Sequence, residues 1–457
     1  MVSTLTDRFR GVIHRPGSAG YDEARSIWNG QVDRRPALIA TCAGPDDVTA
    51  AVRHAIDGGL PLSVRAGGHH VAGSAIVDWG IVIDLSTMNG VRLDPATGRV
   101  RAQGGAKLGD LDRNTLPYGR VVPAGIDQDT GVGGLTLGGG VGWSMRRLGL
   151  ACDSLGAAQL VMADGNQARV DDETDPDLMW ALRGGGGNFG IVTEFEFDSA
   201  PIPRNVLAGF VVYHGADAAD VLRGYRDIVD TAPDELTTIV FLRVAPPVPW
   251  VPAELVGEPI VMVGVVFQGE ADVGAEVVAP LRSLGRPAVD TVALKPFLEH
   301  QEVLEGANPI GHRYYWKSAH VDGLSDTLID LMARHLDSIS SPLSLLGFFQ
   351  LGGRVTAAED RSCFPNRDAA FLVNYAVHWI DPGEDEAHRT WTRTAMSELE
   401  PQGRGAGYVN FLAEDEGAAV EAVYGPERLD RLAAIKRRVD PGNLFRHNQN
   451  IRPDAGS

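Results

Sequence analysis

Two adjacent histidines follow a pair of glycines in a segment that reads Arg65-Ala66-Gly67-Gly68-His69-His70 and continues to Gly73 and Ser74. It lies between two apolar runs that we expect to form strands, Leu60–Val64 and Ile81–Leu85. Glycine lets a backbone turn tightly and approach a ligand closely. Successive backbone N–H groups in such a turn suit a diphosphate, and Arg65 could add further donors. We therefore predict a diphosphate-binding loop with His69 at its lip. A glycine-rich hairpin turn with two surface histidines is the alternative.

The densest concentration of glycine runs from Gly125 to Gly142. Alanine loses less entropy than glycine in an ordinary helix or strand, so another requirement must favour glycine here. Close approach of the backbone to a flat ligand is one such requirement, although a structural turn is the simpler explanation for any single glycine. From this tract we expect ligand contacts at Gly125, Thr130, Gly131, Gly134, Gly138 and Gly140.

A third glycine cluster satisfies the spacing G-x-G-x-x-G, with Gly185, Gly187 and Gly190. A dinucleotide fold of the Rossmann type requires a helix directly after those glycines. The chain continues instead with Ile191–Phe197, whose alternating apolar and polar residues predict a strand. We therefore reject an NAD site at this position.

The elements around these motifs are expected to alternate between strands and helices. A strand at Ala37–Thr41 is followed by an amphipathic helix that starts near Pro45 and ends at Gly58-Gly59. Beyond Pro201-Ile202-Pro203 the glycine clusters end and longer elements follow. The expected strands there are Val206–Tyr213, Thr237–Leu242, Ile260–Phe267, Leu343–Gln350 and Phe371–Trp379, and the expected helices are Asp217–Val229, Ala271–Ala279, Ser325–Ile339 and Asp385–Leu399. This pattern indicates an α+β fold.

Composition excludes several classes of function. The 457 residues carry a formal net charge of −19, which argues against nucleic acid and against an anionic membrane surface. Cys42, Cys152 and Cys363 form no CxxC pair, so neither a disulfide framework nor a zinc site is indicated. We see no signal peptide and no run of about 18 apolar residues, so we expect a cytoplasmic protein without a membrane span. His69 and His70 form a poor metal site, because neighbours in an extended run point to opposite sides.

The order of five motifs resembles a known flavoprotein family. They are Arg-x-Gly-Gly-His at residue 65, the glycine tract before Gly149-Leu150-Ala151, Arg-Gly-Gly-Gly-Gly-Asn-Phe-Gly-Ile-Val from Arg183, Tyr-x-Asn at Tyr408, and Asp-Pro-x-Asn-Leu-Phe-Arg from Asp440. The chain resembles the berberine-bridge-enzyme-like branch of the vanillyl-alcohol-oxidase flavoproteins, with a PCMH-type FAD-binding domain. Its opening segment and tail are most similar to bacterial members.

The resemblance implies an FAD-binding domain built from residues 1–204 and 405–457, with a substrate domain at 205–404 between them. It implies a single covalent bond from His69 to the flavin 8α-methyl group. Members with a second bond carry cysteine where this chain has Asp127, and Cys152 is interpreted as a buried small residue. The resemblance adds Gly190, Ile191 and Val192 to the expected cofactor contacts. His70 is expected near the diphosphate. Asn410 and Asn448 could bind the flavin edge or hold the C-terminal segment.

The resemblance also implies a reaction. Tyr408 would be the base that removes a proton while hydride leaves the substrate, and a nearby positive charge would have to favour its phenolate. In the middle of the chain, the segment Arg313–Lys317, Gln350 and one face of the strand at Asn374–His378 could face the flavin. That face holds Asn374, Ala376 and His378.

We therefore expect an FAD-dependent oxidase that takes a hydride from a CH–OH or CH–N carbon and reduces O2 to H2O2. Its substrate would be a sugar, an alkaloid-like amine or a secondary metabolite. One alternative is a flavin-dependent oxygenase of a polyketide-type substrate, as in some bacterial members. Another is a flavin-binding protein without turnover. The sequence contains no G-x-S-x-G and no HExxH motif, which disfavours serine and zinc hydrolases.

Overall fold

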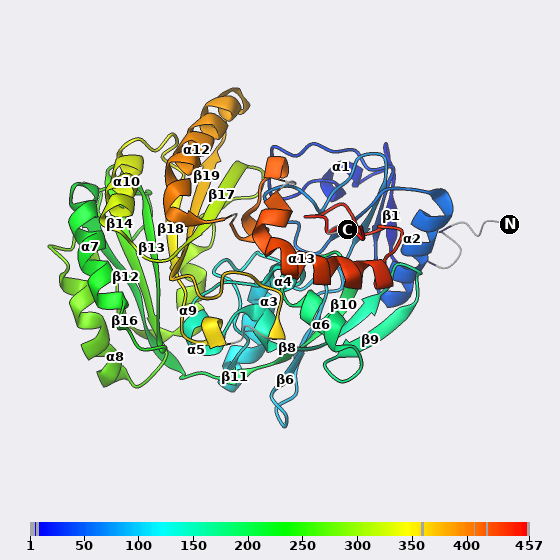
Figure 1. Cartoon of the computed structure of the whole chain (residues 1–457), viewed down its shortest axis with the longest axis horizontal. Coiled ribbons are helices and arrows are strands. Elements are labelled where there is room, and N and C mark those ends of the chain that lie inside the picture. The colour runs from blue at the N-terminus through cyan, green and yellow to red at the C-terminus, as the bar shows by residue number, and fades with distance from the viewer. Residues whose placement is uncertain (1–4, 6–8, 358–360, 406, 417–418, 455–457) are drawn as a thin grey trace.

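The structure is a computed structural model that describes residues 5, 9–357, 361–405, 407–416 and 419–454. Three main sheets and the helices around them form the α+β fold expected from the sequence. In Figure 1, two sheets and the C-terminal helix occupy the right side of the molecule, and one large sheet with its covering helices occupies the left. We refer to these as the first half and the second half.

A four-stranded sheet carries the histidine loop. Its order is β1 (Val12–His14), β2 (Leu38–Thr41), β4 (Ile81–Asp84) and β3 (Leu62–Arg65), with β2 and β3 both parallel to β4. Helix α2 (Pro45–Gly58) connects β2 to β3. Of the apolar stripe predicted from its spacing, it buries Val48, Ala51, Val52 and Ala55, whereas Ile56 is exposed. The loop leaves the carboxyl end of β3, as expected. The sequence also predicts a short helix at Tyr21–Trp28, and the structure has the shorter α1 (Tyr21–Ala24) there.

A second sheet of five antiparallel strands lies beside the first. Its order is β5 (Val91–Leu93), β6 (Arg99–Gln103), β10 (Ile191–Asp198), β8 (Leu155–Val161) and β9 (Gln167–Asp171). The glycines at 185, 187 and 190 therefore lead into a strand, which confirms the rejection of a Rossmann site. This half also contains four further helices and a short strand pair. They are α3 (Leu108–Thr115), α4 (Val132–Gly138), α5 (Met145–Leu148), α6 (Pro176–Leu182), and β7 (Arg120–Val121) with β11 (Ala200–Pro201).

The second half is built on one large antiparallel sheet. Its path is β15 (Val289–Asp290), β12 (Asn205–His214), β14 (Pro259–Phe267), β13 (Leu236–Val244), β18 (Leu345–Gln350), β19 (Phe371–Trp379), β17 (Arg313–Val321) and β20 (Gly403–Arg404), and β16 (Ala293–Pro296) also pairs with β12. The α-helices of the second half are α7 (Ala218–Val229), α8 (Ala271–Val278), α9 (Phe297–Gln301), α10 (Asp326–Asp337), α11 (Arg354–Ala357) and α12 (Asp385–Leu399).

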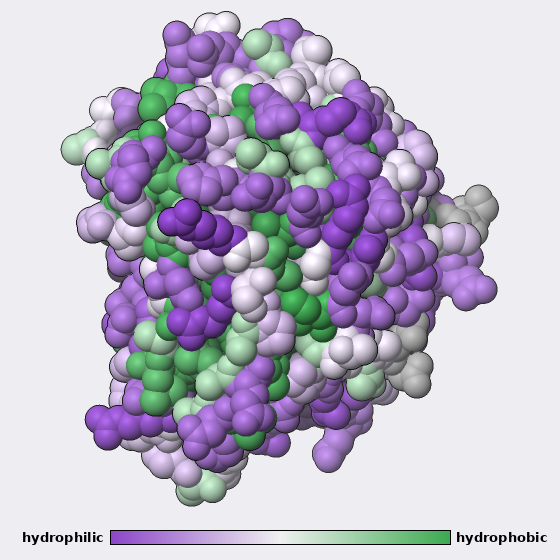
Figure 2. All heavy atoms as spheres, turned by 90° about the vertical axis from the view of Figure 1, so that its left-hand side faces the viewer, coloured by the Kyte–Doolittle hydropathy of each residue, from purple (hydrophilic) through white to green (hydrophobic). Residues whose placement is uncertain are grey.

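The two faces of the large sheet bury different partners. Val240 and Leu242 of β13 pack in one apolar cluster with residues of α7 and α10, whereas Ile239 and Phe241 pack in the cluster that includes the first half. The outer surface over these helices is mainly hydrophilic, with apolar strips visible between hydrophilic side chains (Figure 2). The inner face of the sheet is therefore turned toward the first half.

The last segment of the chain returns to the first half. Helix α13 (Ala419–Val439) bends at Gly425, which has a φ of 70°. Near its end, the buried ammonium of Lys436 donates to the carbonyls of Asn188 and Phe445 and to Asp440. These bonds fasten residues after Asp440 beside the third glycine cluster.

Local pattern placed most of the longer elements correctly. The sequence also predicts a helix at Gly104–Leu116, but α3 begins only at Leu108, and β17 was not predicted as a strand. The glycine tract also contains the short helix α4. A Cβ at Gly138 would lie 2.0 Å from Oδ1 of Asn410, so glycine permits a close contact with protein atoms there.

No helix within the described residues has the length and apolarity needed to cross a membrane. The same residues contain no group of three or more His, Cys, Asp or Glu side chains that could hold a metal ion. All three cysteines are buried and unpaired, which confirms the interpretation of Cys152.

Candidate active site

A cavity of about 320 Å³ lies between the two halves. The histidine loop, the glycine tract and the C-terminal segment line one side, and the inner face of the large sheet lines the other. Sixteen residues expected at the site reach this cavity: Ala66, Gly67, Gly68, His69, His70, Ser74, Gly125, Thr130, Gly131, Gly134, Gly190, Ile191, Val192, Tyr408, Asn410 and Asn448. Segments far apart in sequence thus meet at one site.

Arg65 does not line the cavity. Its guanidinium bonds the carbonyls of Ala24 and Ser26, at 3.3 Å for Ser26, and its Nε lies 3.5 Å from the carboxylate of Asp84. The parallel register of β3 and β4 places Arg65 directly beside Asp84 and so turns it away from the loop. The structure therefore does not bring its donors to the position expected for a diphosphate.

Three expected glycines also lie outside the cavity lining. A Cβ at Gly73 would lie 2.6 Å from the side chain of Val32, so this glycine accommodates protein packing. Gly138 closely approaches Asn410. The N–H of Gly140 donates to the phenol oxygen of Tyr408 over 2.7 Å. Gly138 and Gly140 thus support residues that reach the cavity.

Close packing of two glycine segments forms the floor of the site. A Cβ on Gly67 would lie 2.5 Å from the backbone nitrogen of Gly131, and the reverse contact is equally short. Gly68 has a φ of 67°, which a side chain would disfavour. A Cβ at Gly134 would meet nothing within 4 Å, although Gly134 lines the cavity. Glycine thus joins the two segments and also leaves room for a ligand.

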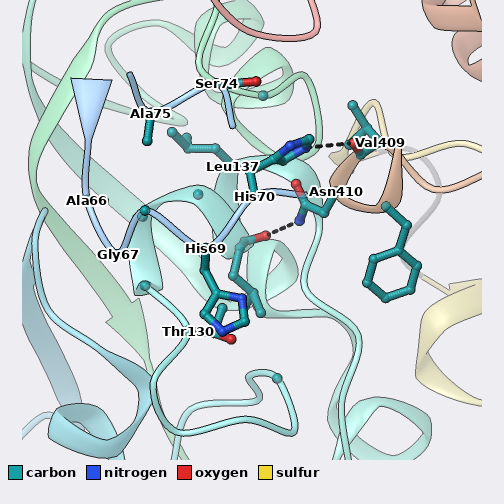
Figure 3. A pocket seen from close by; sticks show the side chains of 18 of the residues that line it. Ala66, Gly67, His69, His70, Ser74, Ala75, Thr130, Leu137, Val409 and Asn410 are labelled. Carbon is teal, nitrogen blue, oxygen red and sulfur yellow. Dashed lines mark hydrogen bonds between the residues drawn. The ribbon is translucent and has the colours of Figure 1, made fainter. Parts of the chain in front are cut away.

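His69 and His70 point to opposite sides of the loop, as the sequence predicted (Figure 3). The ring of His69 stacks on Trp28, with centroids 4.3 Å apart and planes inclined by 16°. Its Nε2 lies 3.7 Å from Oδ2 of Asp127 and has no hydrogen-bond partner. Burial lowers the pKa of His69, and Asp127 opposes this effect in part. The imidazole is therefore neutral near pH 7, which leaves a nitrogen lone pair for bonding.

His70 is held by backbone groups on both ring nitrogens. Its Nε2 lies 3.3 Å from the carbonyl of Val409, and its Nδ1 accepts the N–H of Ala72 over 3.1 Å. Burial lowers the pKa of His70, so this ring is also neutral. These bonds connect the loop to the segment that carries Tyr408.

The phenol oxygen of Tyr408 accepts two N–H donors. Gly140 N lies 2.7 Å away and Asn410 Nδ2 lies 2.6 Å away. Burial raises the pKa of Tyr408 above its ordinary value, and both hydrogen bonds act in the opposite direction. From the sequence we expected a nearby positive charge that would favour the phenolate of Tyr408. In the described part of the chain, N–H donors lie at this oxygen instead. Two donors aimed at one oxygen would stabilise negative charge on it.

The two asparagines hold the C-terminal segment in place. Asn410 also donates to the carbonyl of Leu135 over 3.1 Å. Asn448 donates to the carbonyls of Gly187 and Phe445, both over 3.1 Å. The Oδ1 of Asn448 is buried without a hydrogen-bond partner, so it can still accept a bond from a ligand in the cavity.

The large sheet supplies the opposite wall. Of the face predicted from the alternation in β19, Asn374 and Ala376 line the cavity but His378 does not, and Trp316 joins them from β17. Oδ1 of Asn374 is buried without a partner. Gln350 lies elsewhere, because its amide bonds Thr238 and the carbonyl of Val229 on the outer face.

Sequence reasoning missed other residues of this wall. Phe241 and Arg243 of β13, Met262 of β14 and Leu345 of β18 all line the cavity. The strand expected at Thr237–Leu242 ended one residue before Arg243. Continuing its alternation would have placed Arg243 on the same face as Phe241.

The residues present fit FAD, the cofactor expected from the sequence. A glycine floor with open space over Gly134 would admit a flat ring and a diphosphate. Oδ1 of Asn374 and Oδ1 of Asn448 are buried polar atoms without partners, and both residues line the cavity. Buried polar atoms are normally hydrogen-bonded, so these atoms indicate that the cavity takes a polar ligand.

Comparison with known proteins gives the same result. A family profile described as "FAD binding domain" matches residues 36–171, and one described as "Berberine and berberine like" matches residues 407–452. The chain is 34% identical to (R)-6-hydroxynicotine oxidase of Paenarthrobacter nicotinovorans, over 98% of this chain and 97% of that protein.

Solved structures share the fold along the whole chain. One of 6-hydroxy-D-nicotine oxidase from Arthrobacter nicotinovorans has a TM-score of 0.90 and 33% identity, and the match covers 99% of this chain and 100% of that one. Glucooligosaccharide oxidase from Acremonium strictum, which carries a 6-S-cysteinyl, 8α-N1-histidyl FAD, has a TM-score of 0.85 and 24% identity. That match covers 97% of this chain and 98% of the other.

Proposed function

Because the chain belongs to the berberine-bridge-enzyme-like family of FAD-linked oxidoreductases, we propose that it oxidises a CH–OH or CH–N carbon of a small molecule and reduces O2 to H2O2. The observation that carries this proposal is the placement of Tyr408 in the cavity, with two N–H donors on its oxygen. When bound, FAD would accept the hydride of the substrate.

We propose that FAD is attached to the chain by one covalent bond at His69. Burial keeps this imidazole neutral, and Trp28 fixes its plane by stacking. A second bond would need a cysteine near the ring, and Asp127 occupies that place by its spacing from the glycines. His70 is engaged at both nitrogens by backbone groups, which makes it the poorer nucleophile of the two.

Tyr408 would accept the proton that leaves the substrate O–H or N–H after losing its own phenol proton. Gly140 and Asn410 would stabilise the resulting phenolate, because both are N–H donors to its oxygen. Negative charge on the oxygen would then be shared between two N–H bonds at a buried position. Asn374 and Trp316 would hold the substrate from the opposite wall.

The division of the chain follows from the same proposal. Residues 1–204 and 405–457 would bind FAD, and residues 205–404 would contribute the sheet that covers the substrate. The cavity lining is consistent with this division, because glycines of the first half face aromatic and aliphatic side chains of the large sheet.

The test is to purify the protein, confirm its flavin by absorbance, and supply a panel of alcohols and amines. A substrate should bleach the flavin absorbance without oxygen, and air should restore it with formation of one H2O2 per turnover. Reduction by a substrate without peroxide in air would contradict the oxidase and indicate a dehydrogenase. A flavin that dithionite reduces but that no alcohol or amine reduces would contradict the proposed reaction.

A further inference from the structure

Arg243 is a cavity-lining cation that has no carboxylate partner in the described part of the chain. It is partly buried near the end of β13, and its Nε donates to the carbonyl of Val244 over 3.1 Å. No ion pair or further hydrogen bond from its terminal nitrogens occurs among the described residues. Most other arginines in the interior of the protein have a carboxylate partner. Arg367, for example, is fully buried but bonds Asp153 with both terminal nitrogens.

The strand register places Arg243 on the inner face of the sheet. It lies opposite Leu345, Leu345 lies opposite Ala376, and Ala376 lies opposite Trp316. All four residues line the cavity. They form one row across four strands, with the guanidinium at one end and the indole at the other.

The electrostatic surroundings of Arg243 lack a compensating negative charge. Asp127 is the one carboxylate among the described residues that line the cavity, and it lies beside His69. The basic group that interacts with Arg243 is His378, whose pKa is lowered to about 3 mainly by burial and further by electrostatic interaction with His312 and Arg243. Burial also lowers the pKa of Arg243 to about 10. A partly desolvated cation without a partner is costly unless a ligand supplies the anion.

We propose that Arg243 binds a carboxylate of the substrate, so that the molecule oxidised here is an amine or alcohol that also carries a carboxylate group. This inference rests on the proposed function and names its substrate class. The planar guanidinium presents two parallel N–H donors that match the two oxygens of a carboxylate.

The position of Arg243 also limits the shape of the substrate. Ser318, which accepts the backbone N–H of Tyr408, lies opposite Asn374 on β19. Arg243 and Asn374 are two strands and two residues apart, so their Cα atoms are separated by roughly 12 Å. With the reacting carbon beside Tyr408 and Asn374, as proposed above, the carboxylate would lie several bonds away from it. Phe241, Met262 and Leu345 provide an apolar surface for the part between them.

Benzoate and benzamide provide a matched pair of probes, because they have nearly the same shape and differ in charge. We would titrate each into the flavin-loaded protein and follow the flavin difference spectrum. Binding of benzoate should be at least about tenfold tighter than that of benzamide, as a charged hydrogen bond predicts. Arg243→Gln should abolish the difference, and Arg243→Lys should restore part of it. Arg147→Gln is the control, since Arg147 is also partly buried but lies outside the cavity lining.

Equal affinities in the native protein, or a preference that survives in Arg243→Gln, would overturn the proposal. If Arg243→Gln instead weakens the sulfite adduct of the flavin and leaves the benzoate preference intact, the arginine acts on the cofactor and the proposal also fails. The rise in melting temperature caused by benzoate provides a readout that needs no turnover. If the protein prefers benzoate but oxidises no substrate, the proposed function is therefore contradicted, whereas carboxylate binding by Arg243 is not.

Discussion

The carboxylate of Asp127 lies 3.7 Å from Nε2 of His69, and this nitrogen has no other polar partner. The separation is slightly longer than a hydrogen bond, so a small movement of either side chain would close it. The resemblance described above implies that Asp127 stands where family members with a second flavin bond carry cysteine. If FAD is attached at His69 as proposed, Asp127 could accept the Nε2–H while the other ring nitrogen bonds to the flavin carbon.

The first prediction concerns the rate of flavin attachment. Asp127→Asn should slow covalent bonding at His69 by about tenfold, because a hydrogen bond to a charged acceptor is lost. The rate is measured by mixing purified apoprotein with FAD, precipitating samples with acid at intervals and reading their flavin absorbance. Asp129→Asn is the control, since Asp129 is exposed and pairs with Lys107. Equal rates for Asp127→Asn and the native chain would remove Asp127 from this role.

The second prediction concerns the position of the bond. His69→Ala should yield a protein that binds FAD reversibly and precipitates from acid without colour. His70→Ala should retain the colour, because its ring is committed to Val409 and Ala72. Mass measurement of digested peptides would locate the flavin. Attachment at residue 69 would be contradicted if the His69→Ala protein still carried flavin on that peptide. It would also be contradicted if flavin were lost from His70→Ala and from no other variant.

The third prediction concerns the proton acceptor. Tyr408→Phe should lower kcat by about 10²–10⁴-fold, the usual contribution of a positioned base. Flavin content should be unchanged, because the bonds of Asn410 to Leu135 remain. Tyr424→Phe is a matched control, since Tyr424 is equally buried but donates to the carbonyl of Gly184 and does not line the cavity. Stopped-flow measurement of flavin reduction separates this loss from slower oxygen reaction. Similar rates for both variants would show that Tyr408 is structural.

The floor of the site could be predicted from the sequence, because its signals are local. Glycines at 67, 68, 131 and 134 needed only their own spacing to indicate a close backbone approach, and the strand after Gly190 was visible as alternation. The position of Arg65 was different. It depends on the register between β3 and β4, which sets Asp84 beside it, and a single segment carries no information about that register.

The wall of the site was harder to predict because its contacts join distant segments. Trp28 stacks on Tyr314 with ring centroids 3.6 Å apart, and 286 positions separate them along the chain. Strand β17, which carries Tyr314 and Trp316, is largely buried on both faces and shows no clear alternation. By contrast, α12 is amphipathic and β19 is a run of mostly apolar residues, and their expected bounds agree with the structure to the residue.

The last prediction concerns the dependence of stability on pH. Asp112 is fully buried in α3 and accepts a hydrogen bond of 3.0 Å from Gln301. Burial raises the pKa of Asp112 to about 7, and the bond from Gln301 opposes part of that rise. The folded pKa is thus above the ordinary value of 3.8, so the fold prefers the protonated carboxyl. This contribution to the free energy of unfolding is complete below about pH 4 and is lost as the pH rises through 7.

Asparagine at this position cannot ionise, so Asp112→Asn should remove that loss. Between pH 5 and pH 8 the melting temperature of the variant should rise by a few degrees relative to the native protein, because about 1.4 kcal/mol accompanies each pKa unit. The comparison uses the change between the two pH values, so a constant effect of the amide itself cancels. Asp57→Asn, at an exposed position in α2, should show no such change. Parallel melting curves for Asp112→Asn and the native chain would mean that Asp112 is ionised in the fold throughout this range.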